Sequence, residues 1–424
     1  MKLQKTAIVI VDAYSTGRYI APAFVGRGYP CIHVDTSMQL PTFLKESFEE
    51  CFFLENIIMD QSGIAGIVKH LQKYNIKAVI AGSEMGVNVT DQIADQLNVP
   101  KNDIQYSINR RDKFMMIDAL HKAGVSHIPQ FKSSNVEQIL NWYTTSKLKK
   151  VILKPVMAAL SEGVSICYNE QEIRHVFQIV FGKRNVTGQT NDAMVIQQFH
   201  EGKEYIVNSV SCNGDHFITD IWLGVGGLKD KISTDQYAVQ LFRNDPNFDI
   251  LSSYTKQVLN ALRIRHGAAH SEIKLTSQGP KLIETGARLA GGLDFSLMEE
   301  AQGYSQLSLM INATISPQMF KKYCHIYDAM PQKHVRFVYL CSYIEGRIFK
   351  EPDLKPMLSL QSIHSIIFIL KPGEYLKKTN ESFGRPGFVF MFAEDEQQLE
   401  NDYQALRLYE EKMYLDMLEQ PRDV

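Results

Sequence analysis

Two glutamates in the second half of the chain have the type and spacing of a metal site. They lie in HSEIKLTSQGPKLIETGARLAGG, residues 270–292, where two strand-like stretches flank the turn sequence TSQGP. A hairpin that is symmetric about Gln278 places Glu272 opposite Glu284, where Cβ atoms are about 4.5–5.5 Å apart and like charges destabilise the pair. A divalent cation removes that repulsion, and Mg²⁺ takes one or two carboxylates together with substrate phosphates. The spacing therefore predicts a site for Mg²⁺, with Mn²⁺ as the alternative ion.

The same hairpin also fits a plain solvated surface. Lys274 and Lys281 offset the carboxylates in that interpretation, so the glutamates alone do not decide between the two. Arg288 follows the second glutamate by four residues and precedes Gly291 and Gly292. An arginine beside metal and phosphate stabilises charge on transferring oxygens, and glycines let the backbone approach a substrate. A surface arginine before a turn is the alternative.

Two lysines are candidate phosphate contacts. Lys113 lies at the expected start of a helix in RRDKFMMIDAL, and Lys154 ends an apolar strand before the small-residue loop MAALSEGVS. A lysine at the end of a buried strand, beside a loop, presents a point charge to a phosphate. The loop is not a Walker A motif, because GxxxxGK[ST] is absent. For either lysine taken alone, a solvated surface charge is the more frequent explanation.

A third group of residues fits an adenosine site. The segment IQQFHEGKEYIV places Gln197, Gln198, Phe199 and His200 in an extended run whose backbone donors and acceptors suit a nucleotide base. Glu204, on the following strand, is suited to accept hydrogen bonds from ribose hydroxyls. Standing alone, the segment is equally an ordinary β-hairpin.

The elements that must position these residues begin with strands that alternate with helices. Residues 6–11 (TAIVIV) and 77–82 (KAVIAG) are apolar strands, whereas 63–74 and 90–97 have helical patterns. This alternation predicts a parallel α/β domain, which we place at residues 1–105.

The rest of the chain divides near residue 330. Residues 106–330 again alternate helix and strand and include a hairpin at 268–286. The pattern then changes to antiparallel strands, closed by a long helix at about 395–418. We therefore predict a central domain over 106–330 and a C-terminal α+β lid or support domain over 331–424.

Taken in order, these segments resemble the ATP-grasp fold over about 330 residues. RDKFMMIDALHKAGVSHIP is similar to the segment with the family's first ATP lysine, and QQFHEGKEYIV to its adenine linker and ribose glutamate. The resemblance implies a small nucleotide lobe at about 130–200 and a large lobe at about 201–330. It assigns ATP to Lys113, Lys154, Ser161, Gln197, Gln198, Phe199, His200 and Glu204, the metal to Glu272 and Glu284, and the phosphorylated intermediate to Arg288.

Within that superfamily the chain is most similar to bacterial L-amino-acid (dipeptide) ligases. The similarity is carried by DAYSTGRYIAPAF, GSEMGVNVTDQIADQL, HSEIKL with IETGARLAGG, and LKPGEYL with GRPGFVF. It implies a carboxylate–amine ligase that forms an amide through an acyl phosphate and releases ADP and phosphate. Ser15, Arg18, Glu84, Gly291 and Gly292 are the predicted substrate contacts, since they follow strands or adjoin the arginine. Helix capping is the alternative explanation for Ser15, Arg18 and Glu84.

Two departures from the family pattern concern the metal and the phosphates. Gly286 stands where the superfamily usually has an asparagine that ligates metal, which leaves the number of metal ions open. The phosphate loop, which contains Ser161, reads MAALSEGVS and is poorer in Gly and Ser than usual.

Composition excludes several other classes of protein. With 45 basic and 47 acidic residues, the net charge of −2 offers no basis for a nucleic-acid or anionic-membrane partner. The six cysteines form no CxxC pair, which favours reduced thiols in the cytoplasm. No apolar run approaches the ~20 residues of a membrane span. The predicted partners are small-molecule carboxylate and amine substrates, such as amino acids, and the oligomeric state is open between monomer and homodimer.

Three other functions are the alternatives. One is a purine-pathway or carboxylase-like enzyme with the same fold, and another is a nucleotide-binding protein without turnover. A dinucleotide-dependent dehydrogenase is disfavoured because VDAYSTGR lacks GxGxxG. Neither the two substrates nor the pathway follows from residue spacing.

Overall fold

The described residues of the computed structural model fall into two compact units. They are residues 6–36, 42–157, 162–185, 188, 190–229, 232–379 and 385–418. Unit 1 comprises Met1–Thr219, Asp249–Leu293 and Gln306–Cys324, and unit 2 comprises Asp220–Phe248, Asp294–Ser305 and His325–Val424. The three domains predicted from the sequence differ from these two units, and that division stays a prediction.

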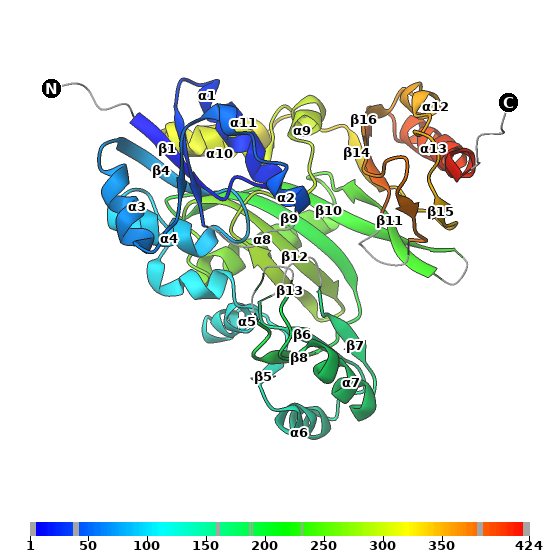
Figure 1. Ribbon diagram of the computed structural model, residues 1–424, viewed down its shortest axis with the longest axis horizontal. Helices are drawn as coiled ribbons and strands as arrows, with labels where there is room; N and C mark the ends of the chain where they lie inside the picture. Colours follow the sequence, from blue (N-terminus) through cyan, green and yellow to red (C-terminus); the bar gives the residue numbers. More distant parts are fainter. Residues whose placement is uncertain are drawn as a thin grey trace. The chain divides into compact units, whose positions relative to one another are not determined.

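Unit 1 begins with a four-stranded parallel sheet in the order β3-β2-β1-β4 (Figure 1). Its strands are β1 (Thr6–Val11), β2 (Cys31–Asp35), β3 (Phe53–Ile58) and β4 (Asn75–Ala81). Helices α3 (Gly63–Leu71) and α4 (Val87–Leu97) pack Leu71 and Ile93 against Val9 and Val11. A parallel sheet reads as a continuous apolar run because its strands are buried, and β1 does so. The predicted parallel α/β fold is confirmed.

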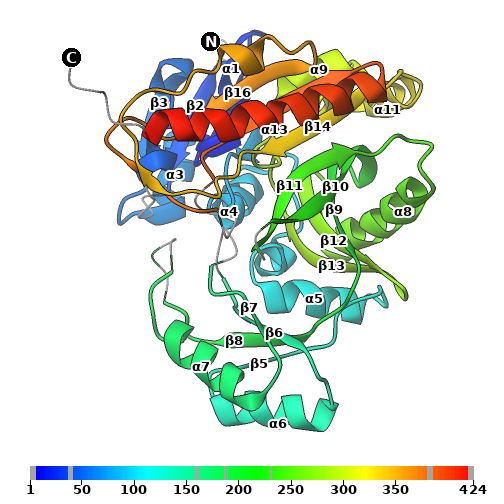
Figure 2. The ribbon, with the colours of Figure 1, turned by 90° about the vertical axis from the view of Figure 1, so that its right-hand side faces the viewer.

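The small lobe of unit 1 is a second sheet, in the order β5-β8-β6-β7 (Figure 2). Its strands are β5 (Gln130–Ser133), β6 (Val151–Pro155), β7 (Ser165–Cys167) and β8 (Met194–Gln198), and its helices are α6 (Val136–Ser146) and α7 (Glu170–Val180). Val151 and Leu153 belong to the core that the helices cover. Successive side chains of a strand point to opposite faces. Ile152 and Lys154 therefore lie on the face away from the helices.

The large lobe of unit 1 contains three antiparallel strands in the order β13-β12-β9. They are β9 (Lys203–Cys212), β12 (Gly267–Thr276) and β13 (Gly279–Gly286), with helices α5 (Lys113–Lys122), α8 (Pro246–Ala261) and α10 (Gln306–Ile315). The buried side chain of Gln306 on α10 donates to the carbonyl oxygens of Ser209 and Ala269, at 3.1 and 2.9 Å. This side-chain amide ties α10 to strands β9 and β12 at once.

Unit 2 is built on antiparallel strands in the order β10-β11-β14-β18-β16. They are β10 (Asp215–Lys229), β11 (Ile232–Gln240), β14 (His334–Tyr339), β16 (Ile363–Phe368) and β18 (Gly387–Ala393). The long helix α13 (Glu396–Leu418) packs Leu399, Tyr403 and Leu406 against Val338 and Val389. The predicted antiparallel C-terminal region and its closing helix are confirmed. No helix among the described residues has the length and apolar character that a membrane span needs.

A buried arginine joins the N-terminal sheet region to the large lobe. Arg110, at the end of the 3-10 helix η3 (Ile104–Arg110), has no exposed surface. Its Nη2 atom lies 2.7 Å from Asp91 Oδ2 on α4, and its Nη1 atom donates to the Leu262 carbonyl at 2.9 Å. Nη2 also donates to the Asp103 carbonyl. Three N–H donors of the guanidinium are therefore satisfied by protein atoms without water.

Removal of this arginine is expected to destabilise the fold strongly. Arg110→Met leaves the carboxylate of Asp91 buried and without its cation, so the free energy of unfolding should fall by about 3–5 kcal/mol. The matched control is Lys101→Met, which breaks the exposed pair of Lys101 with Asp95 (2.7 Å) and should change stability by less than about 1 kcal/mol. Urea denaturation measures both values, and equal effects would contradict this account.

Candidate active site

One cavity of about 190 Å³ collects most of the residues that the sequence singles out. Its walls come from the small-lobe strands β6 and β8, the start of α5 and the β12–β13 hairpin. The predicted residues that line it are Lys113, Lys154, Gln197, Gln198, His200, Glu204, Glu272 and Glu284. These positions span more than 170 residues of sequence, and the fold brings them to a single site.

The two hairpin glutamates face each other because the hairpin contains a β-bulge. Glu272 pairs with Glu284, which confirms the predicted opposition. The assumption of symmetry about Gln278 is wrong, because Thr276 pairs with Gly279 and Ile273 with Leu282. One extra residue on β13 then shifts the register by one, as a bulge does.

A tyrosine supports the backbone at this bulge. The backbone N–H of Leu282 donates to Tyr254 Oη at 2.8 Å, and the same hydroxyl donates to the Ser126 carbonyl at 2.6 Å. Because β13 is an edge strand, an N–H that points away from β12 needs such a partner when it is buried. Burial raises the pKa of Tyr254, so it stays a neutral donor.

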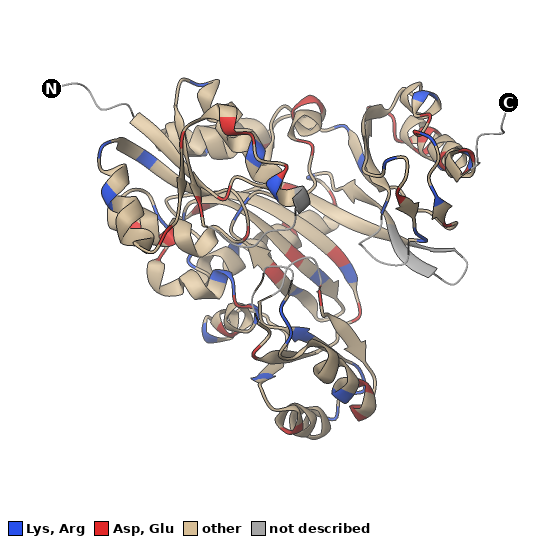
Figure 3. Cartoon of the chain, viewed as in Figure 1, with Lys and Arg blue, Asp and Glu red and all other residues tan. Residues whose placement is uncertain are grey.

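Cations surround the hairpin carboxylates. Lys113 Nζ contacts Glu284 Oε2, and strands β9, β12 and β13 carry acidic and basic residues side by side in Figure 3. Burial by itself raises the pKa of Glu284, but Lys113, Lys154 and Arg288 together lower it below its ordinary value. The carboxylate is therefore ionised, which is the form that binds a metal ion.

Lys154 is a buried lysine whose charge is destabilised. Its side chain is 4 % exposed, and burial, followed by repulsion from Lys113, lowers its pKa to about 8 in spite of attraction to Glu284 and Glu272. Burial destabilises the charged form of a lysine, and an anionic ligand such as a phosphate stabilises it again.

The hairpin offers two carboxylates for a metal ion and no complete protein cage. Among the described residues, no group of three or more His, Cys, Asp or Glu side chains is arranged to hold a metal. His270 Nε2 lies 3.7 Å from Glu272 Oε1, while its Nδ1 is 3.0 Å from Asn208 Oδ1. Two carboxylates are the donor set that Mg²⁺ uses when substrate phosphates complete its coordination.

The end of β8 and the residues just after it line the cavity with Gln197, Gln198 and His200. Gln197 is buried and donates from Nε2 to Gln130 Oε1 at 3.0 Å. The ring of Phe199 lies 3.5 Å from Lys150 Nζ and does not line the cavity. His200 Nε2 is buried without a hydrogen-bond partner among the described residues, and burial, with Lys281 and Lys274, lowers the pKa of its imidazole.

Other predicted contacts lie elsewhere or outside the described residues. Ser15 begins the short 3-10 helix η1 (Ser15–Tyr19), and its backbone N–H already donates to Ser47 Oγ at 2.8 Å. Arg18 donates to the hydroxyl of Tyr19 at 2.6 Å. Ser161 lies outside the described residues. Gly291 and Gly292 form an exposed turn. The substrate role of Ser15, Arg18, Gly291 and Gly292 and the ATP role of Ser161 stay predictions.

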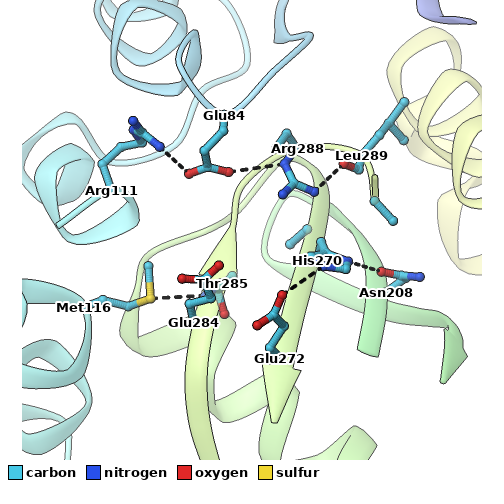
Figure 4. Close-up of polar contacts among 12 residues, drawn as sticks. Glu84, Arg111, Met116, Asn208, His270, Glu272, Glu284, Thr285, Arg288 and Leu289 are labelled. Carbon is cyan, nitrogen blue, oxygen red and sulfur yellow. Dashed lines mark hydrogen bonds and ion pairs between the residues drawn. The ribbon is translucent and has the colours of Figure 1, made fainter. Parts of the chain in front are cut away.

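Glu84 and Arg288 meet in an ion-pair cluster that sequence reasoning did not anticipate (Figure 4). Glu84 Oε2 lies 3.2 Å from Arg288 Nε, and Glu84 Oε1 lies 2.7 Å from Arg111 Nη1. Arg111 escaped notice although it is the first residue of the RDK motif, because no sequence spacing relates it to the loop after β4. Lys274, treated in the sequence only as an offset to the glutamates, also lines the cavity.

Comparison with known proteins assigns this site to a family. The family profile for the ATP-grasp domain matches residues 148–295. The chain is 31% identical to dapdiamide A synthase of Enterobacter agglomerans over 412 residues, which are 97% of each chain. The chain belongs to the ATP-grasp family. It is also 23% identical to the alanine–anticapsin ligase of Bacillus subtilis over 278 residues, 60% of this chain and 57% of that one.

A solved structure agrees with the fold. The L-amino acid ligase from Bacillus licheniformis superposes with a TM-score of 0.72, at 16% identity, over 96% of this chain and 98% of that one. The predicted fold class and family are confirmed. This ATP-grasp protein is an ATP-dependent ligase that forms amide bonds.

The buried charge of Lys154 predicts a pH-dependent stability. Its pKa is about 8 in the folded chain and about 10.4 in an unfolded one, so the charged form destabilises the fold. Lys154→Met should therefore raise the free energy of unfolding at pH 7 by about 3 kcal/mol. The gain should shrink as pH rises from about 8 to 10.4, because native wild type releases its proton first.

Urea denaturation of the ligand-free protein at pH 7 and pH 10 tests this expectation. The exposed neighbour Lys149 supplies the control, and Lys149→Met should leave stability nearly unchanged at both pH values. A loss of stability in Lys154→Met at pH 7 would contradict the account.

Proposed function

We propose that this ligase phosphorylates the carboxylate of one amino acid with ATP and joins the acyl phosphate to the amino group of another. The products are then an amide, ADP and phosphate. The observation that supports this proposal is the cavity in which Lys113, Lys154, Glu272 and Glu284 meet. Opposed cations and carboxylates in one partly desolvated space suit a nucleoside triphosphate with its metal ion.

The roles follow from position within the cavity. Lys154, buried at the end of β6, and Lys113, at the start of α5, bind the phosphates of ATP. The backbone of the segment from Gln197 to His200 binds the adenine, and Glu204 accepts hydrogen bonds from the ribose. Glu204 is half-exposed and lies 3.9 Å from Lys274 Nζ, so it remains accessible to hydroxyl groups.

Glu272 and Glu284 are the residues that hold Mg²⁺, or Mn²⁺ in its place. When bound, the ion neutralises charge on the phosphate oxygens of ATP. Glu284 also contacts Lys113, so the protein's own cation offsets the two carboxylates in the free chain. With ATP and the metal ion present, Lys113 would contact the phosphates and Glu284 the metal ion in place of their contact with each other.

Activation is required because a carboxylate does not condense with an amine in water. Phosphorylation converts the carboxylate oxygen into a good leaving group, and attack by the amine then releases phosphate. The protein contributes position and charge neutralisation rather than a covalent intermediate of its own. Arg288, beside the hairpin, stabilises the negative charge of the acyl phosphate as the amine attacks.

Amino acids are the proposed substrates because of the relatives. The names of two similar proteins, alanine–anticapsin ligase and L-amino acid ligase, state that those proteins act on amino acids. The purine-pathway and carboxylase-like alternatives share the fold, but no feature of this cavity favours them. Cytoplasmic location and the choice between monomer and homodimer stay predictions.

ADP release over pairs of amino acids tests the function. Wild type should release one ADP and one phosphate for each amide, with the product identified by mass. AMP and pyrophosphate would mean adenylation and would overturn the acyl-phosphate proposal. ADP release only with ribosyl phosphates or bicarbonate would favour the purine-pathway or carboxylase-like alternatives. The absence of ADP release with every substrate tested would favour a nucleotide-binding protein without turnover.

The metal assignment predicts a loss of Mg²⁺ dependence. Glu272→Gln and Glu284→Gln should each keep the fold and retain weak nucleotide binding, because one oxygen and the side-chain shape remain. Turnover should fall by at least 10²-fold, and titration calorimetry should show ATP affinity that no longer rises with Mg²⁺. Glu201→Gln is the control, since Glu201 is an exposed carboxylate paired with Lys150 at the rim of the linker. Unchanged kcat in both cavity variants would overturn the assignment.

A further inference from the structure

Glu84 lies between two arginines and is the residue that joins them. Its two carboxylate oxygens bind different guanidiniums, Arg111 at 2.7 Å and Arg288 at 3.2 Å. Burial by itself raises the pKa of Glu84, but the two arginines lower it below its ordinary value. These three side chains carry a net charge of +1, and Glu284 lies near enough to raise the pKa of Glu84 in part.

The contacts of Arg288 fix the plane of its guanidinium. Nε is held by Glu84, and Nη1 donates to the Leu289 carbonyl at 2.8 Å. Nη2 makes no hydrogen bond with the part of the chain that the structure describes. Because a guanidinium is planar and its five N–H donors are fixed in direction, two anchored nitrogens determine where the third points.

The direction of Arg288 is toward the hairpin. In Figure 4 its guanidinium lies beside Glu84, and Glu272 and Glu284 lie below the two. Arg288 also contributes to the lowered pKa of Glu284, which requires the two charges to be close. Arg288 does not itself line the cavity that contains Glu272 and Glu284, and its charge acts on Glu284 from beside that cavity.

Gly286 provides the space for this arrangement. A Cβ at this position would lie 2.5 Å from Glu84 Oε2 and 3.4 Å from Arg288 Nε. The backbone of Gly286 is in a region open to any residue, unlike that of the glycines with positive φ. A glycine is therefore needed here for the carboxylate of Glu84 and not for the conformation of the chain.

We propose that Glu84 is a positioning residue, which holds the Arg288 guanidinium for the acyl phosphate and makes no contact with substrate. Gly286 is the second component, because it leaves room for the carboxylate. The loop after β4, in the N-terminal sheet region, thereby orients a group of the large lobe. This role rests on the proposed ligase function and replaces the substrate contact expected for Glu84 from its place after a strand.

Loss of the Glu84 charge should reduce turnover more than binding. The single carbonyl oxygen in Glu84→Gln cannot replace two charged oxygens that bind two arginines, which then repel each other. A displacement of about 1 Å at such a group lowers turnover by about 10²-fold, so kcat should fall by that order. KM for both amino acids and Kd for Mg-ATP should stay within about threefold, because Arg288 acts on the intermediate.

The matched control is Glu55→Gln. Glu55 also pairs with two side chains in the N-terminal sheet region, His70 at 2.7 Å and Lys73 at 2.8 Å. These pairs are more exposed than those of Glu84, so the loss of the Glu55 charge should lower stability less and should leave kcat unchanged. A fall in kcat in both variants, in proportion to stability, would reduce the role of Glu84 to a structural one.

A double-variant cycle separates positioning from direct contact with substrate. If Glu84 acts only through Arg288, then Glu84→Gln should lower kcat no further in the Arg288→Ala background. A second fall of the same factor, or a large rise in KM for the amine in the single variant, would mean that Glu84 binds substrate and would overturn the inference.

Gly286→Ala tests the same geometry without removing a charge. The added methyl displaces the Glu84 carboxylate, so kcat should fall at least tenfold while KM and melting temperature change little. This variant also decides the matter if Glu84→Gln fails to fold. Wild-type kcat in Gly286→Ala, in an enzyme that forms amides, would overturn the inference alone. An absence of amide formation by wild type would overturn the proposed function and the inference with it.

Discussion

The active site depends on the balance of charge around two carboxylates paired across one hairpin. Glu272 and Glu284 repel each other in the free chain, and Lys113, Lys154 and Arg288 offset that repulsion. These cations repel one another in turn, and repulsion from Lys113 adds to the effect of burial in lowering the pKa of Lys154. The free protein is therefore a strained arrangement of charge. In the function that we propose, a triphosphate with its metal ion would satisfy both sets of charges.

That strain is maintained because each charged group stands on rigid structure. Lys154 is held on the cavity face of β6 by a neighbouring face that is packed against α6 and α7. Glu284 keeps its position because Tyr254 satisfies the backbone at the bulge, and Lys113 begins a helix that Asp112 caps. Preorganised charges of this kind need no rearrangement when negative charge develops on a substrate, which is where electrostatic catalysis gains its effect.

The N-terminal sheet contributes to chemistry through one loop. Its strands end at the edge where parallel sheets place functional residues, and Glu84 follows β4 there. Buried Arg110 anchors the same region to the large lobe through Asp91 and Leu262. A rigid connection of this kind allows Glu84 to hold Arg288 at a fixed angle. The family relationship to amide-forming ligases is consistent with such a site, because an acyl phosphate needs a fixed cation while the amine attacks.

The amino-acid sequence by itself determined the family, the fold class and most of the cavity. Lys154 was predicted at the end of an apolar strand, Lys113 at the start of a helix in the RDK segment, and Glu272 and Glu284 as an opposed pair from their spacing. These features are local, since strand and helix periodicity decides which side a residue faces. Only the tertiary structure decided the bulge that brings the glutamates into register, the hydroxyl of Tyr254 that supports it, and the contacts of Arg111 and Gly286 with Glu84. Those depend on the approach of segments far apart in the chain, and pairwise distances between such segments are not encoded in any local spacing of residues.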